Sequence, residues 1–269
     1  MLLKNDRRRT KVLADNEDAI VEVVEEEINK GNIPTREKVL RKVREKTAER
    51  GREALKRKAK TYNKNELPLV VHDNFYDYCM DIIEPNSIDH IVTDPPYPKE
   101  FLPLWSQLSE ADSRVLKPGG FCITYTGEYH LPEVIDRLRE HLDWYWIVCM
   151  RMAGAHAVVY PRNISKGYRT ILVFYKKPME KVKGRIHDLI IDSGGRDKEL
   201  HKWQQAEGGF AKLLKMFTLP GQMILDPFGG SGTVPVVCMK NNRRCLCIEI
   251  NETDASIIKG RLIKTFEDM

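Results

Sequence analysis

Apolar side chains recur with two different periods along this chain, and the period changes near residue 66. Residues 15–30 carry apolar positions at helical spacing on an acidic background, and Gly31 follows them as a helix stop. Thr35 is a suitable N-cap for a second helical stretch, residues 36–60, whose charged side chains are mostly basic. The pattern therefore predicts a pair of helices at the N-terminus.

From residue 67 onward, short β-rich runs alternate with amphipathic helical stretches, which is typical of a parallel α/β sheet. The expected strands are residues 69–72, 88–93, 121–126, 144–152, 169–176, 223–225 and 245–249. The expected helices are residues 76–83, 101–115, 132–141, 209–217, 234–241 and 253–266. The pattern therefore predicts seven strands in a mostly parallel sheet, with helices on both faces.

Composition agrees with a folded domain, since 42% of the 269 residues are hydrophobic and 31% are charged. No apolar run approaches the roughly 18–20 residues of a membrane helix, and the basic N-terminus lacks the apolar stretch of a signal peptide. We therefore expect a soluble cytoplasmic protein. The six cysteines form no CxxC pair and the histidines show no ligand spacing, so we expect buried thiols and no metal site.

The formal charge of +5 is concentrated at one end of the chain. Residues 1–65 hold 19 Lys and Arg against 12 Asp and Glu, whereas the remaining residues hold 25 against 27. Residues 36–60 alone carry twelve basic side chains and four glutamates. Such a helix is either a solvated face with internal ion pairs or a surface that lies on nucleic acid phosphates. Composition alone leaves both interpretations open.

A strand, a glycine turn and a helix follow one another at residues 223–241. Gly230 and Gly232 let the backbone approach a ligand, and the helix N-terminus offers N–H groups to an anion. Glu249 ends the next strand, where an acid commonly accepts from ribose hydroxyls. Pro235 stands where a dinucleotide motif has its third glycine. We therefore expect a nucleoside with an anionic end, and S-adenosylmethionine fits.

A second motif, Asp94-Pro95-Pro96-Tyr97, follows an apolar strand. The prolines hold the acid in a rigid, extended conformation. A carboxylate and a backbone carbonyl can both accept from one exocyclic amino group and so aim its nitrogen lone pair at an electrophile. Tyr97 offers a π-face to a base that has been swung out of its stack. These four residues are the predicted catalytic residues.

The two motifs in this order resemble the β-class (permuted) DNA amino-methyltransferases, which modify adenine N6 or cytosine N4. In that arrangement the catalytic motif precedes the cofactor motif, with a variable segment between them. The resemblance covers about residues 67–265. It implies a Rossmann-like, S-adenosylmethionine-dependent methyltransferase fold: α/β, with a seven-stranded, mostly parallel sheet whose last strand is reversed. The chain would then divide into a basic helical arm, residues 1–65, and a methyltransferase domain, residues 66–269.

The resemblance also implies a role for each matching position. Asp94 and the Pro95 carbonyl would hold the target amino group while Tyr97 stacks on the base, and no general base is obligatory. Adenine N6 is favoured over cytosine N4 because the first motif residue is Asp, whereas Ser is more usual in cytosine enzymes. The positions that would bind the cofactor are Asp73, Asp226, Phe228, Gly230, Ser231, Gly232, Thr233, Glu249 and His201.

Residues 153–200 occupy the target-recognition position, and their basic side chains with interleaved aromatics suit contacts to phosphates and bases. This segment is small, so we expect the basic arm to assist it. The predicted DNA contacts are Arg162, Lys166 and Tyr168 in the recognition segment and Arg41, Arg44 and Arg57 in the arm.

These features predict a site-specific enzyme that methylates N6 of a flipped-out adenine in duplex DNA. The expected setting is a prokaryotic or phage restriction–modification context, with the chain acting alone, as a homodimer or with a partner subunit. Three alternatives stay open: cytosine-N4 methylation, adenosine-N6 methylation of RNA, and a catalytically silent subunit that binds nucleic acid.

Overall fold

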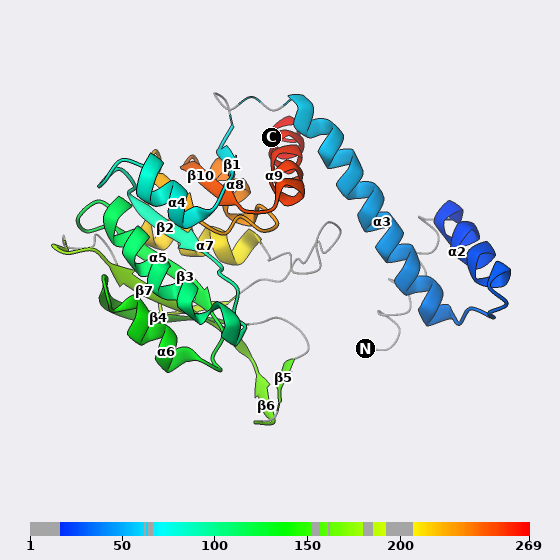
Figure 1. The fold of residues 1–269 in the computed structure, drawn as a ribbon, viewed down its shortest axis with the longest axis horizontal. Helices are drawn as coiled ribbons and strands as arrows, with labels where there is room; N and C mark the ends of the chain where they lie inside the picture. The colour runs from blue at the N-terminus through cyan, green and yellow to red at the C-terminus, as the bar shows by residue number, and fades with distance from the viewer. Residues whose placement is uncertain are drawn as a thin grey trace.

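The structure is a computed structural model that describes residues 17–61, 63, 67–151, 157–160, 162–179, 185–191 and 207–269. A twisted sheet with helices on both faces forms the body, and a pair of helices extends from one side of it (Figure 1). The predicted α/β fold is confirmed. Each helix and strand expected from residue 69 onward has a counterpart in the structure, with bounds that differ by a few residues.

Eight strands form the main sheet, one more than expected. They are β1 (Leu69–His72), β2 (His90–Thr93), β3 (Phe121–Thr126), β4 (Asp143–Arg151), β7 (Tyr168–Tyr175), β8 (Leu189–Ile191), β9 (Met223–Asp226) and β10 (Arg244–Glu249). Their spatial order is β1–β10–β9–β2–β3–β7–β4–β8. Neighbours are parallel except where β7 runs antiparallel to β3 and β4. One reversed strand was expected, but it is β7, and not the last strand along the chain.

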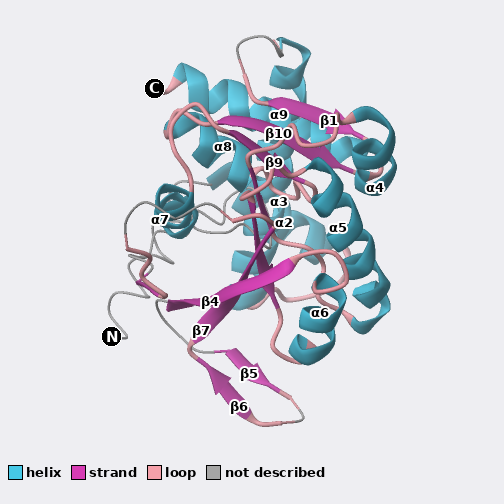
Figure 2. Ribbon diagram, turned by 90° about the vertical axis from the view of Figure 1, so that its left-hand side faces the viewer, coloured by secondary structure: helices cyan, strands magenta, loops and turns pink. Residues whose placement is uncertain are grey.

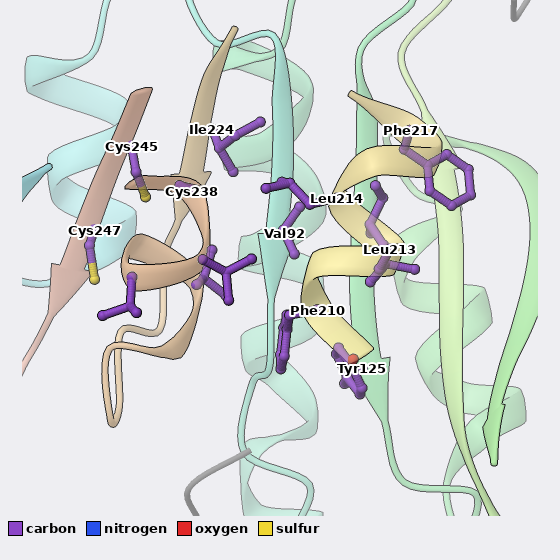
Figure 3. Close-up of a cluster of buried hydrophobic side chains, with 14 of the residues drawn as sticks. Val92, Tyr125, Phe210, Leu213, Leu214, Phe217, Ile224, Cys238, Cys245 and Cys247 are labelled. Atoms are coloured by element: carbon purple, nitrogen blue, oxygen red, sulfur yellow. The ribbon is translucent and has the colours of Figure 1, made fainter. Parts of the chain in front are cut away.

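Helices cover both faces of the sheet (Figure 2). One layer contains α4 (Phe75–Asp77), the π-helical turn η2 (Tyr78–Ile82), the short η3 (Lys99–Phe101), α5 (Leu102–Val115) and α6 (Leu131–Leu138). The other layer contains α7 (Glu207–Phe217), α8 (Thr233–Lys240) and α9 (Glu252–Glu267). Strand residues alternate between the layers: Ile91 packs toward the α5 layer, whereas Val92 packs toward α7, as Figure 3 shows for the α7 side.

Two short elements were not predicted. β8 adds a three-residue strand to the edge beyond β4, and β5 (Ala157–Val159) pairs with β6 (Ile164–Lys166) in a separate hairpin. This hairpin lies within the predicted recognition segment. Strands of three residues are too short to show an alternating pattern, so neither element has a periodic signal in the sequence.

The N-terminal helices α2 (Glu17–Asn29) and α3 (Arg36–Lys58) form the expected hairpin, followed by a 3-10 turn, η1 (Ala59–Thr61). Thr35 caps α3 by accepting from the Lys38 backbone N–H, as predicted. The far end of α3 packs on α9, where any Cβ at Gly260 would overlap the Leu55 carbonyl oxygen. The close approach of these two backbones therefore requires glycine at position 260.

No helix in the described ranges is long and apolar enough to cross a membrane. The same ranges contain no group of three His, Cys, Asp or Glu side chains that could hold a metal ion. All six cysteines are free thiols, and five of them are buried.

Asp112 on α5 is a buried acid without a strong hydrogen-bond donor. Its carboxylate oxygens receive no N–H or O–H donor from the described residues, and only the weakly donating Cys122 thiol faces them. Burial raises the pKa of Asp112 from 3.8 to about 8. The carboxyl is therefore protonated at neutral pH, and it must ionise at a cost as the pH rises.

Replacing Asp112 by Asn should make the fold less sensitive to alkaline pH. Because the folded-state pKa lies above the unfolded one, the stability due to this carboxyl is complete below about pH 4 and falls until about pH 8. The free energy of unfolding of Asp112→Asn relative to wild type should rise by about 1.4 kcal/mol per pH unit across that window. Urea titrations at several pH values measure it. Asp136→Asn, at an exposed position on α6, is the control, and equal pH dependence in both variants would contradict the assignment.

Candidate active site

The two sequence motifs meet at one edge of the sheet. β2, which leads into Asp94, is the parallel neighbour of β9, which leads into the glycine loop, and Ile91 lies opposite Leu225. The carboxyl ends of parallel strands lie at the same edge, so both motifs leave the sheet side by side. The buried Thr93 hydroxyl joins the two strand ends by donating to Asp226 Oδ1 at 2.8 Å.

Tight packing explains two of the three glycines in the loop between β9 and α8. A Cβ at Gly229 would lie 2.6 Å from the Cys247 sulfur, and one at Gly232 would lie 2.9 Å from Ile258 Cγ2. Gly232 also has a left-handed φ of 74°, which favours glycine. Arg261 on α9 holds the loop by donating to the Ser231 carbonyl at 2.7 Å.

Glu249 lies against the glycine loop from the end of β10. Its Oε2 accepts from the Gly230 N–H at 2.7 Å, and its Oε1 accepts from the Asn251 N–H at 2.9 Å. Burial raises the pKa of Glu249, although these two backbone donors oppose the shift. The acid that was expected to meet a ribose is therefore held in place by the loop backbone itself.

Asp226 is almost completely buried, and its carboxylate is used inside the protein. It accepts from Thr93 and from the Phe228 N–H at 3.3 Å. Burial raises its pKa to about 7, and the negative charges of Glu249 and Asp94 add to the shift. Asp226 thus shapes the start of the loop and belongs to a cluster of three neighbouring acids.

The Asp-Pro-Pro-Tyr motif leaves β2 with its acid and its tyrosine in contact. The Tyr97 hydroxyl donates to Asp94 Oδ1, and burial of that hydroxyl together with the charge of Asp94 raises the pKa of Tyr97. The residue as a whole is 38% exposed, so part of the side chain stays accessible. The ring packs on Gly127, where a Cβ would lie 3.3–3.4 Å from Tyr97 atoms.

Asp73 and Phe228 also lie at this edge. The Asp73 N–H donates to the Glu249 carbonyl at 3.2 Å, which joins the ends of β1 and β10. The Phe228 ring lies 4.7 Å from the ring of Phe75, measured between centroids. Phe75 was not predicted, because a single aromatic residue after a strand matches no motif. Ser231 and Thr233 share a 3.1 Å hydrogen bond at the start of α8.

The predicted DNA contacts of the recognition segment lie beside the turn that follows β3. Lys166 pairs with Glu128 at 2.6 Å, and the Arg162 guanidinium lies 4.4 Å from the centre of the Tyr129 ring. Tyr168 is 46% exposed at the start of β7. Gly127 begins the same turn and packs on the Tyr97 ring, so the three consecutive residues 127–129 contact both Tyr97 and the segment that contains the hairpin. His201 lies outside the described residues.

An open α/β sheet whose adjacent strand ends carry a glycine loop with a ribose-type acid and an Asp-Pro-Pro-Tyr motif defines a methyltransferase fold of the Rossmann-like class. The N6/N4 methyltransferase family, described as DNA methylase, matches residues 88–260, and the chain belongs to this family.

Individual relatives agree with that assignment. Type II methyltransferase M.HpaI of Haemophilus parainfluenzae is 25% identical over 222 residues, which cover 68% of this chain and 71% of that protein. The M1.HpyAVI–SAM complex has a TM-score of 0.60 at 22% identity and covers 72% of this chain and 98% of its own. PvuII DNA methyltransferase, named cytosine-N4-specific, has a TM-score of 0.57 at 14% identity and covers 75% and 94%. These two structures share the fold.

Gly232→Ala should weaken S-adenosylmethionine binding by about tenfold or more, because the left-handed backbone and the contact with Ile258 both resist a Cβ. Gly221→Ala is a matched control: its φ is also left-handed, at 85°, but nothing lies within 4 Å of the added Cβ and the turn is outside the loop. Calorimetric titration with S-adenosylmethionine measures both. Equal weakening in the two variants would show that general destabilisation is the cause.

Proposed function

We propose that the protein transfers a methyl group from S-adenosylmethionine to the N6 amino group of an adenine swung out of duplex DNA. The observation that carries the proposal is the position of Asp94 and Pro95 at the end of β2, beside the strand whose end forms the glycine loop. Neighbouring strands lie about 4.8 Å apart. A nucleophile held by the first motif and a methyl donor held by the second therefore meet at one edge.

S-adenosylmethionine is the cofactor, and the residues of the site fit it. Its sulfonium and ammonium groups are positively charged, and Asp94, Asp226 and Glu249 form a cluster of neighbouring acids. Gly230, where an added Cβ would meet only the Phe228 carbonyl oxygen at 3.8 Å, admits close approach of a ligand to the loop backbone, and Glu249 lies at the strand end suited to ribose hydroxyls. When bound, the cofactor supplies an electrophilic methyl group.

Asp94 and the Pro95 carbonyl are both acceptors, and together they orient the two N–H bonds of an exocyclic amino group. With S-adenosylmethionine bound, the nitrogen lone pair would face the methyl group, and a C–N bond would form as the C–S bond breaks and S-adenosylhomocysteine leaves. The nitrogen becomes cationic and loses its surplus proton afterwards, so positioning supplies most of the rate. The Tyr97 hydroxyl fixes the Asp94 carboxylate, and the ring, backed by Gly127, stacks on the flipped base.

Adenine is the proposed base because the motif begins with Asp. The acidic side chain accepts from an amino group in either base, so chemistry at the amino group permits cytosine N4 as well. The product therefore has to be identified directly, and the same experiment separates a DNA enzyme from an RNA enzyme.

Asp94→Ala should lower methyl transfer by about a thousandfold or more while leaving S-adenosylmethionine binding intact. The reason is that the amino group loses one of its two hydrogen-bond acceptors and is no longer oriented toward the methyl group. Tritiated-methyl transfer to DNA and to RNA, followed by nucleoside mass spectrometry, measures rate and product together. Asp136→Ala, an exposed acid on α6, is the matched control and should behave as wild type.

Each outcome of this experiment has a clear meaning. N6-methyladenine in DNA supports the proposal, whereas N4-methylcytosine replaces adenine by cytosine. Product in RNA alone overturns the DNA assignment. Unchanged transfer by Asp94→Ala overturns the mechanism, and a wild type that binds DNA without any transfer indicates a silent subunit.

A further inference from the structure

The basic charge of α3 is divided between two faces, and α2 neutralises one of them. Glu27 pairs with Lys38 at 2.5 Å and with Lys42, and these two lysines lower the pKa of Glu27 to about 2. Glu26 pairs with Lys46 at 2.5 Å. The small apolar contact of Val23 with Val39 and Val43 lies at the same interface. The basic side chains on this face therefore hold the hairpin together.

A second face of α3 carries Leu55, whose backbone lies against α9 of the methyltransferase domain. Residues 41, 44, 48, 51 and 55 are spaced by three or four positions, so they lie along one side of the helix. Leu55 contacts α9 on this side, because its backbone lies directly against Gly260. Toward the N-terminal end of α3, the same side carries Arg41 and Arg44. Glu37, one turn before Arg41, is acidic and ends the basic part of this side.

Arg41 and Arg44 carry charge that the protein leaves in solvent. Arg44 is exposed and has no acidic partner in the described part of the chain. Arg41 lies 3.9 Å from Glu45, but the two side chains are 69% and 67% exposed, so the pair contributes little. Neither arginine is needed to hold α2, in contrast to the lysines of the first face.

The helix that anchors the arm also supports the cofactor loop. On α9, Gly260 receives α3, while Ile258 packs on Gly232 and Arg261 holds Ser231. The direction of α3 is thereby set relative to the active site. Figure 1 shows that one end of α3 lies next to α9 and that the helix extends from there away from the α/β body, toward α2. Arg41 and Leu55 are 14 helical steps apart, a distance of about 21 Å along α3, which corresponds to about six base pairs of duplex.

We propose that Arg41 and Arg44 bind backbone phosphates of the duplex that flanks the target base, several base pairs away from it. This inference rests on the proposed function. Arg57, which sequence charge alone had assigned to DNA, lies about 160° around the helix from Arg41 and is not part of this surface. The partner is recognised through its phosphate spacing and charge, so the contact strengthens binding without reading sequence.

The test uses the full-length protein and its methylated target site in duplexes of increasing flank length. In Arg41→Gln/Arg44→Gln the slope of log affinity against log salt should fall by about 2, since each phosphate contact contributes about 0.9. Wild-type affinity should rise when a flank is lengthened to about six base pairs or more on one side, and the double variant should lose that gain. Arg57→Gln, with the same charge change on the same helix, should match wild type in both measurements.

The outcomes separate this inference from the proposed function. If the wild type methylates DNA and the double variant keeps both the salt slope and the flank dependence, the α3 surface is a solvated face and the inference is wrong. If the wild type neither binds nor methylates any duplex, the proposed function is wrong, and the inference about α3 is wrong with it. Thermal melting checks the fold, and the melting temperature of the double variant should equal that of wild type because neither arginine pairs with α2.

Discussion

The parallel pairing of β2 with β9 is the contact on which the site depends. It joins residues far apart along the chain, since Thr93 and Asp226 are separated by 133 positions and share a buried hydrogen bond. Without it, the acceptors after β2 and the loop after β9 would be unrelated turns. With it, the Asp-Pro-Pro-Tyr motif and the glycine loop leave the sheet side by side, which is the arrangement that the proposed in-line methyl transfer needs.

The same pairing brings together two motifs that are far apart along the chain. Between them the chain forms β3, β4, β7 and β8 on one side of β2, and it then returns to the other side of β2 as β9. The glycine loop between β9 and α8 is held by α9, through Ile258 and Arg261, and α9 also carries the N-terminal helices through Gly260. One helix therefore links the glycine loop and the basic hairpin.

Local patterns were sufficient to predict most of the sheet and both motifs, because strand ends, prolines and glycine turns act over a few residues. The two motifs and Glu249 lie close together, at the adjacent ends of β2, β9 and β10, as predicted. The features that could not be predicted are contacts between residues that are far apart along the chain. The lysines on one face of α3 pair with Glu27 on α2. The Tyr97 ring packs on Gly127, and buried Asp112 lies beside Cys122 on β3. None of these pairings has a spacing that a single sequence reveals.

The reversed direction of β7 has a consequence for how such a protein can change. Because Arg151 at the end of β4 pairs with Tyr168 at the start of β7, the segment between them begins and ends on one closed rung of the sheet. Length and content can vary there without altering the register of any core strand. A change of length or sequence between these two residues would therefore leave the adjacent ends of β2 and β9, and the two motifs that follow them, in place.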